Sequence, residues 1–126
     1  MMLRDLTTPT LDGERVQLSD LRGRRNLVLI FAGTDAEEAR LISELQGCGE
    51  TLREEETVVA IFAAADADTR AWYGALAEDG TPRAALYISD RYGEIYFAAH
   101  PEPGQALPSA AEALEWLRFI NAQCPE

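Results

Sequence analysis

Runs of apolar residues separated by polar turn sequences predict the strands of this chain. Residues 26–32 and 58–63 are almost continuously apolar, which is typical of strands buried on both faces. Residues 84–89 and 94–99 are two further runs around the turn sequence Asp-Arg-Tyr-Gly at 90–93, and this arrangement predicts an antiparallel hairpin. None of these runs is long enough to span a membrane.

Between the first two apolar runs, the apolar residues follow the spacing of a helix. A helix is predicted over residues 35–53, because four side chains there fall on one helical face: Leu41, Leu45, Cys48 and Leu52. Gly47 and Gly49 lie inside this helix and weaken its second half. We therefore expect a kink or an early end near these two glycines.

Capping residues mark the starts of two further helices. Asp66 or Asp68 is expected to cap a helix that continues to about Leu76. Ser109 and Glu112 form the S-x-x-E capping box of the last helix. The apolar face of that helix is predicted at Ala113, Leu114, Leu117 and Ile120.

The N-terminal residues predict a short hairpin over 11–18, with a turn at Asp12-Gly13, followed by a helical turn at 19–23. The full order is hairpin, strand, helix, strand, helix, hairpin, helix. A strand–helix–strand crossover implies a parallel pair, and a tight hairpin implies antiparallel strands. We therefore expect one α/β domain over residues 1–126, with a mixed central sheet flanked by helices and an N-terminal hairpin extension.

Composition and charge limit the functions of the chain. Hydrophobic residues make up 47% and charged residues 26% of its 126 residues, as in ordinary globular domains. The 22 acidic residues stand against 11 basic residues, all of them arginine, for a formal net charge of -11. This charge disfavours nucleic acid and anionic membranes as partners. The excess of acid in residues 34–79 predicts either a solvated helix surface that aids solubility or a docking patch for a basic partner.

Neither a metal site nor a cofactor site stands out in the sequence. His100 is the only histidine, and we interpret it as a loop residue at a strand end. We therefore expect no metal and no cofactor. The N-terminus carries no signal-peptide pattern, and two cysteines fit a reducing compartment, so a cytoplasmic location is expected.

Two stretches of the sequence resemble the peroxiredoxin-like branch of the thioredoxin-fold proteins. Residues 11–24, L-D-G-E-R-V-Q-L-S-D-L-R-G-R, are similar to the D-G-x-x-V-x-L-S-D-L-x-G-K opening of the alkyl hydroperoxide reductase and thiol-specific antioxidant family. Residues 83–90, R-A-A-L-Y-I-S-D, followed by Gly93 and Ile95, resemble the family's R-x-x-F-x-I-D-x-x-G-x-I segment. The resemblance covers nearly the whole chain and implies a thioredoxin-like fold and a thiol oxidoreductase or antioxidant activity.

The sequence departs from this family at the thiol that carries its chemistry. The P-x-x-x-T-x-x-C motif of peroxiredoxins falls on Gly33, Glu37 and Arg40 when it is counted from the end of the apolar strand. The C-x-x-C motif of thioredoxins falls on Ala36 and Ala39. No cysteine lies between residues 31 and 46, so a shift of a few residues does not recover either motif.

The charges around this position also oppose thiol chemistry. Asp35, Glu37 and Glu38 surround the place where a thiolate would form. Three nearby carboxylates would raise the pKa of a thiol there and disfavour its reactive form. The predicted electrostatic field is therefore wrong for a nucleophilic cysteine.

Two features that the resemblance implies are retained. Pro82, preceded by Thr81, falls where thioredoxin-fold proteins carry a cis-proline facing the redox helix, and we expect this bond to be cis. Arg83 falls on the peroxiredoxin arginine that helps to polarise the peroxide. Because no attacking thiol is visible, we expect Arg83 to pair with Asp35 or Glu38 instead.

The two cysteines lie elsewhere, and each has two interpretations. Cys48 lies on the apolar stripe of its helix and is either a buried structural residue or a redox-active thiol at the helix end. Cys124 is either incidental or part of a redox or metal pair, since the chain as given ends one residue short of a possible C-x-x-C. A disulfide between the two residues, or between subunits, stays open.

Two functional hypotheses follow. The leading one is a divergent redoxin-like binding or regulatory module that has lost peroxidase and dithiol chemistry and that binds a protein partner or forms a homodimer. The alternative is a thiol-dependent oxidoreductase that uses Cys48 or Cys124 to reduce a peroxide or a disulfide. The candidate site retained from the family comprises Gly33, Asp35, Ala36, Glu37, Ala39, Arg40, Thr81, Pro82 and Arg83.

Overall fold

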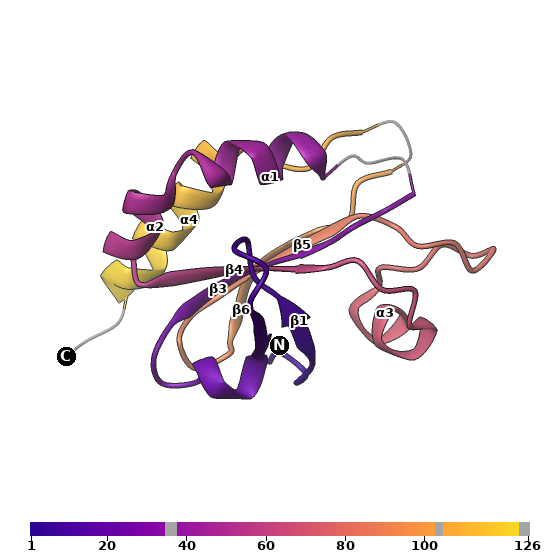
Figure 1. The fold of residues 1–126 in the computed structure, drawn as a ribbon, viewed down its shortest axis with the longest axis horizontal. Helices are drawn as coiled ribbons and strands as arrows, with labels where there is room; N and C mark the ends of the chain where they lie inside the picture. Colours follow the sequence, from indigo (N-terminus) through magenta and orange to yellow (C-terminus); the bar gives the residue numbers. More distant parts are fainter. Residues whose placement is uncertain (35–37, 103–104, 124–126) are drawn as a thin grey trace.

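A mixed four-stranded sheet forms the centre of the molecule (Figure 1). The computed structural model describes residues 1–34, 38–102 and 105–123. Strands lie in the order β4-β3-β5-β6, with β3 and β4 parallel and the other pairs antiparallel. Their bounds are Asn26–Phe31 for β3, Thr57–Phe62 for β4, Ala85–Ser89 for β5 and Ile95–Ala99 for β6. The predicted α/β class and the mixed sheet are confirmed.

Strand β3 separates two hydrophobic cores because every one of its residues is buried. Val28 and Ile30 point into one core, whereas Leu27, Leu29 and Phe31 point into the other. This alternation is the two-residue period of a strand expressed on a sheet that is covered on both faces. The continuous apolar run in the sequence is the direct consequence.

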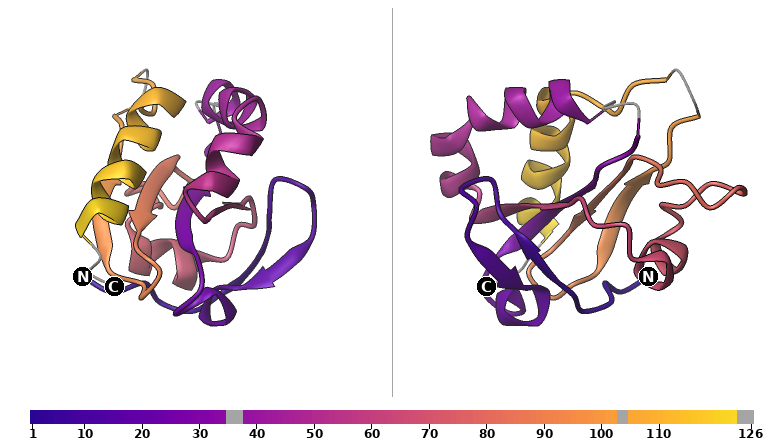
Figure 2. Two further views of the ribbon diagram at one scale, coloured as in Figure 1. Left: turned by 90° about the vertical axis from the view of Figure 1, so that its left-hand side faces the viewer. Right: turned by 45° about the vertical axis from the view of Figure 1, so that its right-hand side comes forward.

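Three helices cover the first face, and α4 lies beside α1 and α2 over the same side of the sheet (Figure 2). They are α1 (Ala39–Gln46), α2 (Gly49–Glu54) and α4 (Ala110–Gln123). The break predicted near Gly47 is confirmed, because one helix ends there and the next begins two residues later. The predicted start at residue 35 lies outside the described residues. Helix α1 begins at Ala39, and the carbonyl of Glu38, the residue before it, accepts the N–H of Ile42.

The other face carries α3 (Ala67–Tyr73), the hairpin of β1 (Thr7–Pro9) and β2 (Arg15–Gln17), and the short 3₁₀ helix η1 (Leu18–Leu21). Asp66 caps α3 by accepting the N–H of Thr69 at 3.4 Å. The helix ends at Gly74, whose positive φ of 77° suits glycine. It therefore stops before Leu76, where the sequence pattern had placed its end.

The N-terminal hairpin lies against the outer edge of β4. The hydroxyl of Thr8 donates to the carbonyl of Ile61 at 2.8 Å, and the N–H of Leu11 donates to the carbonyl of Val59 at 3.1 Å. The hairpin extension is thus confirmed, and it covers part of an edge that would otherwise be open. No helix within the described residues has both the length and the apolar composition that a membrane crossing requires.

The bond before Pro82 is trans, which corrects the cis-proline predicted from the resemblance: none of the described peptide bonds is cis. The chain around Pro82 runs antiparallel to residues 75–77. Ala77 donates its N–H to the carbonyl of Thr81 at 2.8 Å, and Arg83 donates to the carbonyl of Ala75 at 2.9 Å. A trans bond before Pro82 allows the extended backbone that these two hydrogen bonds require. The cis isomer is less stable and is not needed to form them.

Candidate functional site

The candidate site lies where β3 ends and β5 begins, and a buried arginine connects its parts. Arg70 on α3 has none of its surface exposed. Its guanidinium donates to five backbone carbonyls, those of Ala32 (2.8 Å), Phe62 (3.4 Å), Ala64 (2.6 Å), Ala75 (3.2 Å) and Arg83 (3.2 Å). The ends of β3 and β4 and the segment before β5 are therefore held by one side chain.

The positive charge of Arg70 is balanced mainly by carbonyl dipoles. Burial lowers the pKa of its guanidinium, and the negative charge of Glu38 acts in the opposite direction. The rings of Phe31 and Phe62 each lie 5.7 Å from the guanidinium carbon. We had not singled out Arg70 from the sequence. The indication that the sequence offered was an arginine within a short predicted helix, directly followed by the residues Ala-Trp-Tyr.

A carboxylate occupies the loop after β3. The N–H of Gly33 donates to Glu38 Oε1 at 3.2 Å. Here a donor is taken by a carboxylate of the same chain. Asp35, Ala36 and Glu37, also predicted for this site, lie outside the described residues.

Ala39 and Arg40 are the first two residues of α1, and Arg40 is directed away from the sheet ends. Its guanidinium donates to Glu44 Oε2 at 2.9 Å and to the carbonyl of Leu107 at 2.7 Å. The N–H of Ala110 and then Arg40 lower the pKa of the Glu44 carboxyl. The residue at the expected position of a peroxidatic thiol therefore links α1 to the segment that enters α4.

Thr81 and Arg83 do not face Glu38. The N–H and hydroxyl of Thr81 both donate to Asp79 Oδ1, at 3.0 and 2.7 Å, and these bonds lower the pKa of Asp79. Arg83 donates to the carbonyl of Pro101 at 2.6 Å and lies 3.9 Å from the carboxylate of Glu102. The expected pairing of Arg83 with Glu38 is wrong, since the side chain follows the loop after β6 instead.

Cys48 is a free thiol between α1 and α2, far from these groups. It is half-buried and packs against the core shared by Leu45 and Leu52. It lies beyond the C-terminal end of α1, whose eight residues span about 12 Å. Cys124 lies outside the described residues, so the pairing of the two thiols is not tested.

His100 lies in the loop after β6, as predicted, but it takes part in a hydrogen-bonded cluster. Its Nε2 lies within hydrogen-bonding distance of the Tyr87 hydroxyl and 3.1 Å from the carbonyl of Tyr73. The Tyr73 hydroxyl in turn bonds to the backbone of Arg4. Burial raises the pKa of Tyr73 to about 12 and raises that of Tyr87 as well. No group of three or more metal-binding side chains comes together within residues 1–34, 38–102 and 105–123.

Comparison with known proteins assigns this architecture to a class. No protein-family model and no curated protein matches the sequence. The structure, however, superposes on a reduced 2-Cys peroxiredoxin of Plasmodium vivax with a TM-score of 0.80 and 13% identity, covering 98% of this chain and 85% of that chain. The chain therefore has the thioredoxin-like fold in the form that peroxiredoxins use.

Two bacterial structures agree. AhpC of Enterococcus faecalis matches with a TM-score of 0.74 and 16% identity over 99% of this chain and 97% of that chain. The peroxidoxin BcpB of Mycobacterium tuberculosis matches with a TM-score of 0.71 and 16% identity over 95% and 96% of the two chains. At such identities the agreement defines the fold, and the chemistry has to be argued from the residues of this chain.

Proposed function

We propose that this chain is a redoxin-like protein that binds a protein partner and has lost peroxidase and dithiol chemistry. The observation that carries the proposal is Arg40. It lies at the start of α1 where the resemblance places the attacking thiol, and its two hydrogen bonds fix it to Glu44 and Leu107. A guanidinium in this position has no nucleophilic role and performs a structural one.

The charges of the loop support the same conclusion. A reactive cysteine needs neighbouring donors and positive charge, because the thiolate is the nucleophile. In this chain the carboxylate of Glu38 instead accepts the N–H of Gly33. Arg70 is a buried cation at this end of the sheet, and its five carbonyl partners leave it no donor directed at a substrate.

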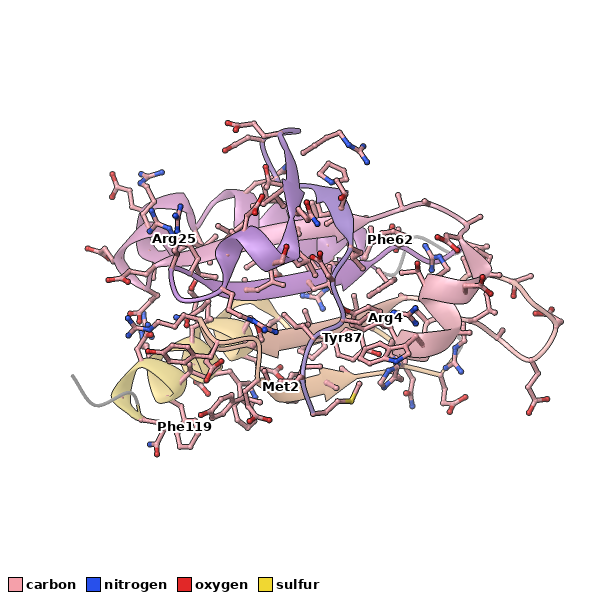
Figure 3. The ribbon with its side chains drawn as sticks, turned by 90° about the horizontal axis from the view of Figure 1, so that it is seen from below. Met2, Arg4, Arg25, Phe62, Tyr87 and Phe119 are labelled. Carbon is pink, nitrogen blue, oxygen red and sulfur yellow. The ribbon has the colours of Figure 1, made fainter. Side chains whose placement is uncertain are left out.

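A partner surface is available where α4 lies beside the edge strand β6. The rings of Phe97 and Trp116 stack with centroids 5.2 Å apart, and Phe119 contacts Trp116 at 5.8 Å and Tyr96 at 6.4 Å. Phe119 is 49% exposed and projects from α4 at the outer side of the molecule (Figure 3). We define these four residues as the aromatic surface. Phe119 is exposed and the other three are partly buried against the core. Clustered aromatic residues that reach the surface are characteristic of interfaces, and we propose a second copy of the chain as the partner.

The reactivity of the thiols towards peroxide tests the loss of chemistry. Protein is mixed with one equivalent of hydrogen peroxide at neutral pH, and oxidation of Cys48 and Cys124 is followed by intact mass and thiol titration. We expect both thiols to survive for many minutes, because accessible thiols of low pKa oxidise fast and others do not. A reducing compartment such as the cytoplasm fits this proposal.

The alternative function is a thiol-dependent oxidoreductase, favoured by the incomplete burial of Cys48. Oxidation within seconds, with recovery by a dithiol, would overturn our proposal in favour of this one. The variant Cys48→Ala and the double variant Cys48→Ala, Cys124→Ala assign the reacting thiol. A rate that survives in the single variant and disappears in the double one would identify Cys124.

A further inference from the structure

A groove of about 440 Å³ runs beside the outer edge of β4, between the turn of the N-terminal hairpin and the junction of α1 and α2. Both views of Figure 2 show this turn close to α2. The apolar part of the groove is formed by Leu45, Leu52 and Val59, which belong to the buried core. The groove therefore gives a ligand access to core side chains between a pair of helices and the edge of a strand.

The backbone of β4 is open where it lines this groove. The N–H of Leu11 donates to the carbonyl of Val59 at 3.1 Å, and the hairpin then turns away from the strand. Alternate residues of a strand point their backbone groups to the same side, so the N–H and carbonyl of Thr57 also point outward. Within the described residues neither of these two groups has a hydrogen-bond partner. The hairpin thus covers one part of the edge and leaves Thr57 available.

An open strand edge beside an apolar groove is suited to an extended peptide. One residue of an antiparallel strand exchanges two hydrogen bonds with the residue opposite, here Thr57. Side chains of opposite residues lie on the same face, and Thr57 shares its face with Val59, which packs in the core under α1 and α2. The peptide residue opposite Thr57 therefore directs its side chain towards Leu45 and Leu52. In such strand addition the main chain supplies affinity and the side-chain pocket supplies specificity.

The charge of the groove indicates which peptide it accepts. Asp12 and Glu14 line its hairpin side, and both residues are exposed. None of the ion pairs among the described residues includes either carboxylate. Arg53 lies on the helix side, where its Nη1 is 3.7 Å from the position of a Cβ added at Gly49. Together with the net charge of -11, the two free carboxylates favour a ligand that carries basic residues.

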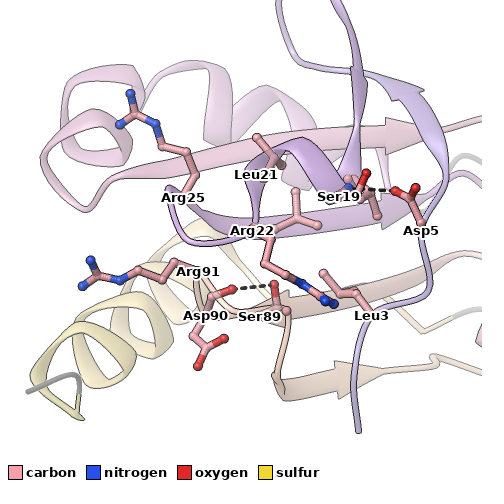
Figure 4. A pocket seen from close by; sticks show the side chains of 12 residues that line it. Leu3, Asp5, Ser19, Leu21, Arg22, Arg25, Ser89, Asp90 and Arg91 are labelled. Atoms are coloured by element: carbon pink, nitrogen blue, oxygen red, sulfur yellow. Dashed lines mark hydrogen bonds between the residues drawn. The ribbon is translucent and has the colours of Figure 1, made fainter.

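The polar groups of a smaller pocket, of about 150 Å³ at the start of β3, are by contrast bonded within the chain (Figure 4). The carboxylate of Asp5 accepts the N–H of Ser19 at 2.7 Å, and the hydroxyl of Ser89 donates to the carbonyl of Asp90 at 3.2 Å. The carboxylate of Asp90 accepts the N–H of Tyr92 at 2.9 Å. These groups stabilise the fold, so the edge of β4 is the better candidate for a binding site.

From this arrangement we propose that the groove binds an extended peptide segment of a basic protein partner, which adds a strand to the open end of β4. An aliphatic side chain of the peptide packs on Leu45 and Leu52, and a lysine or arginine lies towards Asp12 and Glu14. Strands β4 and β6 form opposite edges of the sheet. This inference therefore stands independently of the aromatic surface and of the homodimer proposed there.

Titration of the ¹⁵N-labelled full chain with the peptide acetyl-Lys-Val-Lys-Val-Lys-amide tests the proposal by the shifts of backbone amide signals. We expect saturable shifts at Thr57, Val58 and Val59, and slower hydrogen exchange of the Thr57 N–H, because this group gains an acceptor in the complex. The same peptide N-methylated at both valines lacks the donors that face Thr57. It should bind about fivefold or more weakly, since a buried backbone hydrogen bond is lost. Acetyl-Lys-Ser-Lys-Ser-Lys-amide should also bind weakly because it lacks the apolar side chains.

Matched charge variants separate the groove from general attraction to an acidic protein. The double variant Asp12→Asn, Glu14→Gln should bind the valine peptide about threefold more weakly, and asparagine before glycine still suits the turn. The control Glu78→Gln, Glu115→Gln removes two exposed charges elsewhere and should keep the affinity of the wild type. The amide spectrum of each variant shows directly that the fold is intact.

Several outcomes would overturn the proposal. They are the absence of saturable shifts, shifts that do not include Thr57, and equal binding of the valine peptide and its N-methylated or serine counterpart. An equal loss of affinity in both charge variants would show attraction to the overall charge and would overturn it as well. Shifts at Thr57 that follow protein concentration without any peptide would show that a second copy occupies the edge, in contradiction of the proposed partner.

Discussion

Arg70 donates a hydrogen bond of 2.8 Å to the carbonyl of Ala32, the residue that follows β3. The same guanidinium reaches the carbonyl of Arg83, just before β5. A side chain from α3 therefore fixes the spacing of two segments that lie about fifty positions apart in the sequence. In this protein the geometry at the end of the central strands depends on a buried cation rather than on a cis-proline.

Replacement of Arg70 should cost much of the stability of the fold. Arg70→Met keeps much of the apolar volume but leaves several buried carbonyls with fewer donors, so we expect the free energy of unfolding to fall by about 3 kcal/mol or more. Urea denaturation measures this change. Arg53→Met, at an exposed position of α2, should change it by less than about 0.5 kcal/mol. A loss below about 1 kcal/mol for Arg70→Met would show that the carbonyls find other partners.

Ionisation of Tyr73 should make the protein less stable in alkali. Its pKa is raised from 10.0 to about 12 in the folded chain, so the unfolded chain loses this proton first as the pH rises. The contribution is complete below about pH 10 and is lost progressively towards pH 12. We expect the free energy of unfolding to fall across this interval, and to fall less steeply in Tyr73→Phe. Urea denaturation at several pH values gives the slope of the free energy of unfolding against pH for the wild type and for Tyr73→Phe. Equal slopes would contradict a raised pKa of Tyr73.

The aromatic surface should determine the oligomeric state. Phe119→Glu places a charge among Tyr96, Phe97 and Trp116, where a second copy would have to bury it. We expect sedimentation velocity to show a dimer for the wild type and a monomer for this variant. Ala111→Glu adds the same charge at an exposed position near the other end of α4 and should leave the dimer intact. A wild type that stays monomeric at high concentration would contradict the homodimer.

The sequence predicted features that depend on neighbours along the chain. The apolar run of β3, the break at Gly47 and the cap of α4 are of this kind, and the N–H of Glu112 does donate to the Ser109 hydroxyl at 3.2 Å. The directions of Arg40 and Arg83 were not predictable in this way. Arg83 bonds to the carbonyl of Pro101 and Arg40 to that of Leu107, and these carbonyls approach the two arginines only after the chain has folded.

The same reasoning explains why the approach of residues 22–25 to the turn at 90–93 could not be predicted from the sequence. The two segments lie side by side because the N–H of Gly23 donates to the carbonyl of Arg91 at 2.6 Å. Long-range contacts of this kind follow from the topology of the sheet, which places the start of β3 beside the end of β5.

A cysteine restored at position 40 tests whether the missing thiol is the whole difference from a peroxidase. In a background of Cys48→Ala and Cys124→Ala, we expect Arg40→Cys to react with hydrogen peroxide no faster than a simple thiol. The reason is the Glu38 carboxylate, which accepts the N–H of Gly33 just before α1. A negative charge close to a thiol raises its pKa and so lowers the fraction of reactive thiolate.

Adding Glu38→Gln to that variant removes the charge and keeps the shape of the side chain. The pKa of the new thiol should then fall, and its oxidation at pH 7 should accelerate by a few-fold, on the order of what one screened charge at short range provides. Intact mass against time gives both rates, and a pH profile of the reaction locates the pKa. A fast reaction of Arg40→Cys alone would mean that the scaffold has kept an activating field and lacks only the sulfur. Slow reaction there with acceleration by Glu38→Gln would mean that the loop itself now opposes the chemistry.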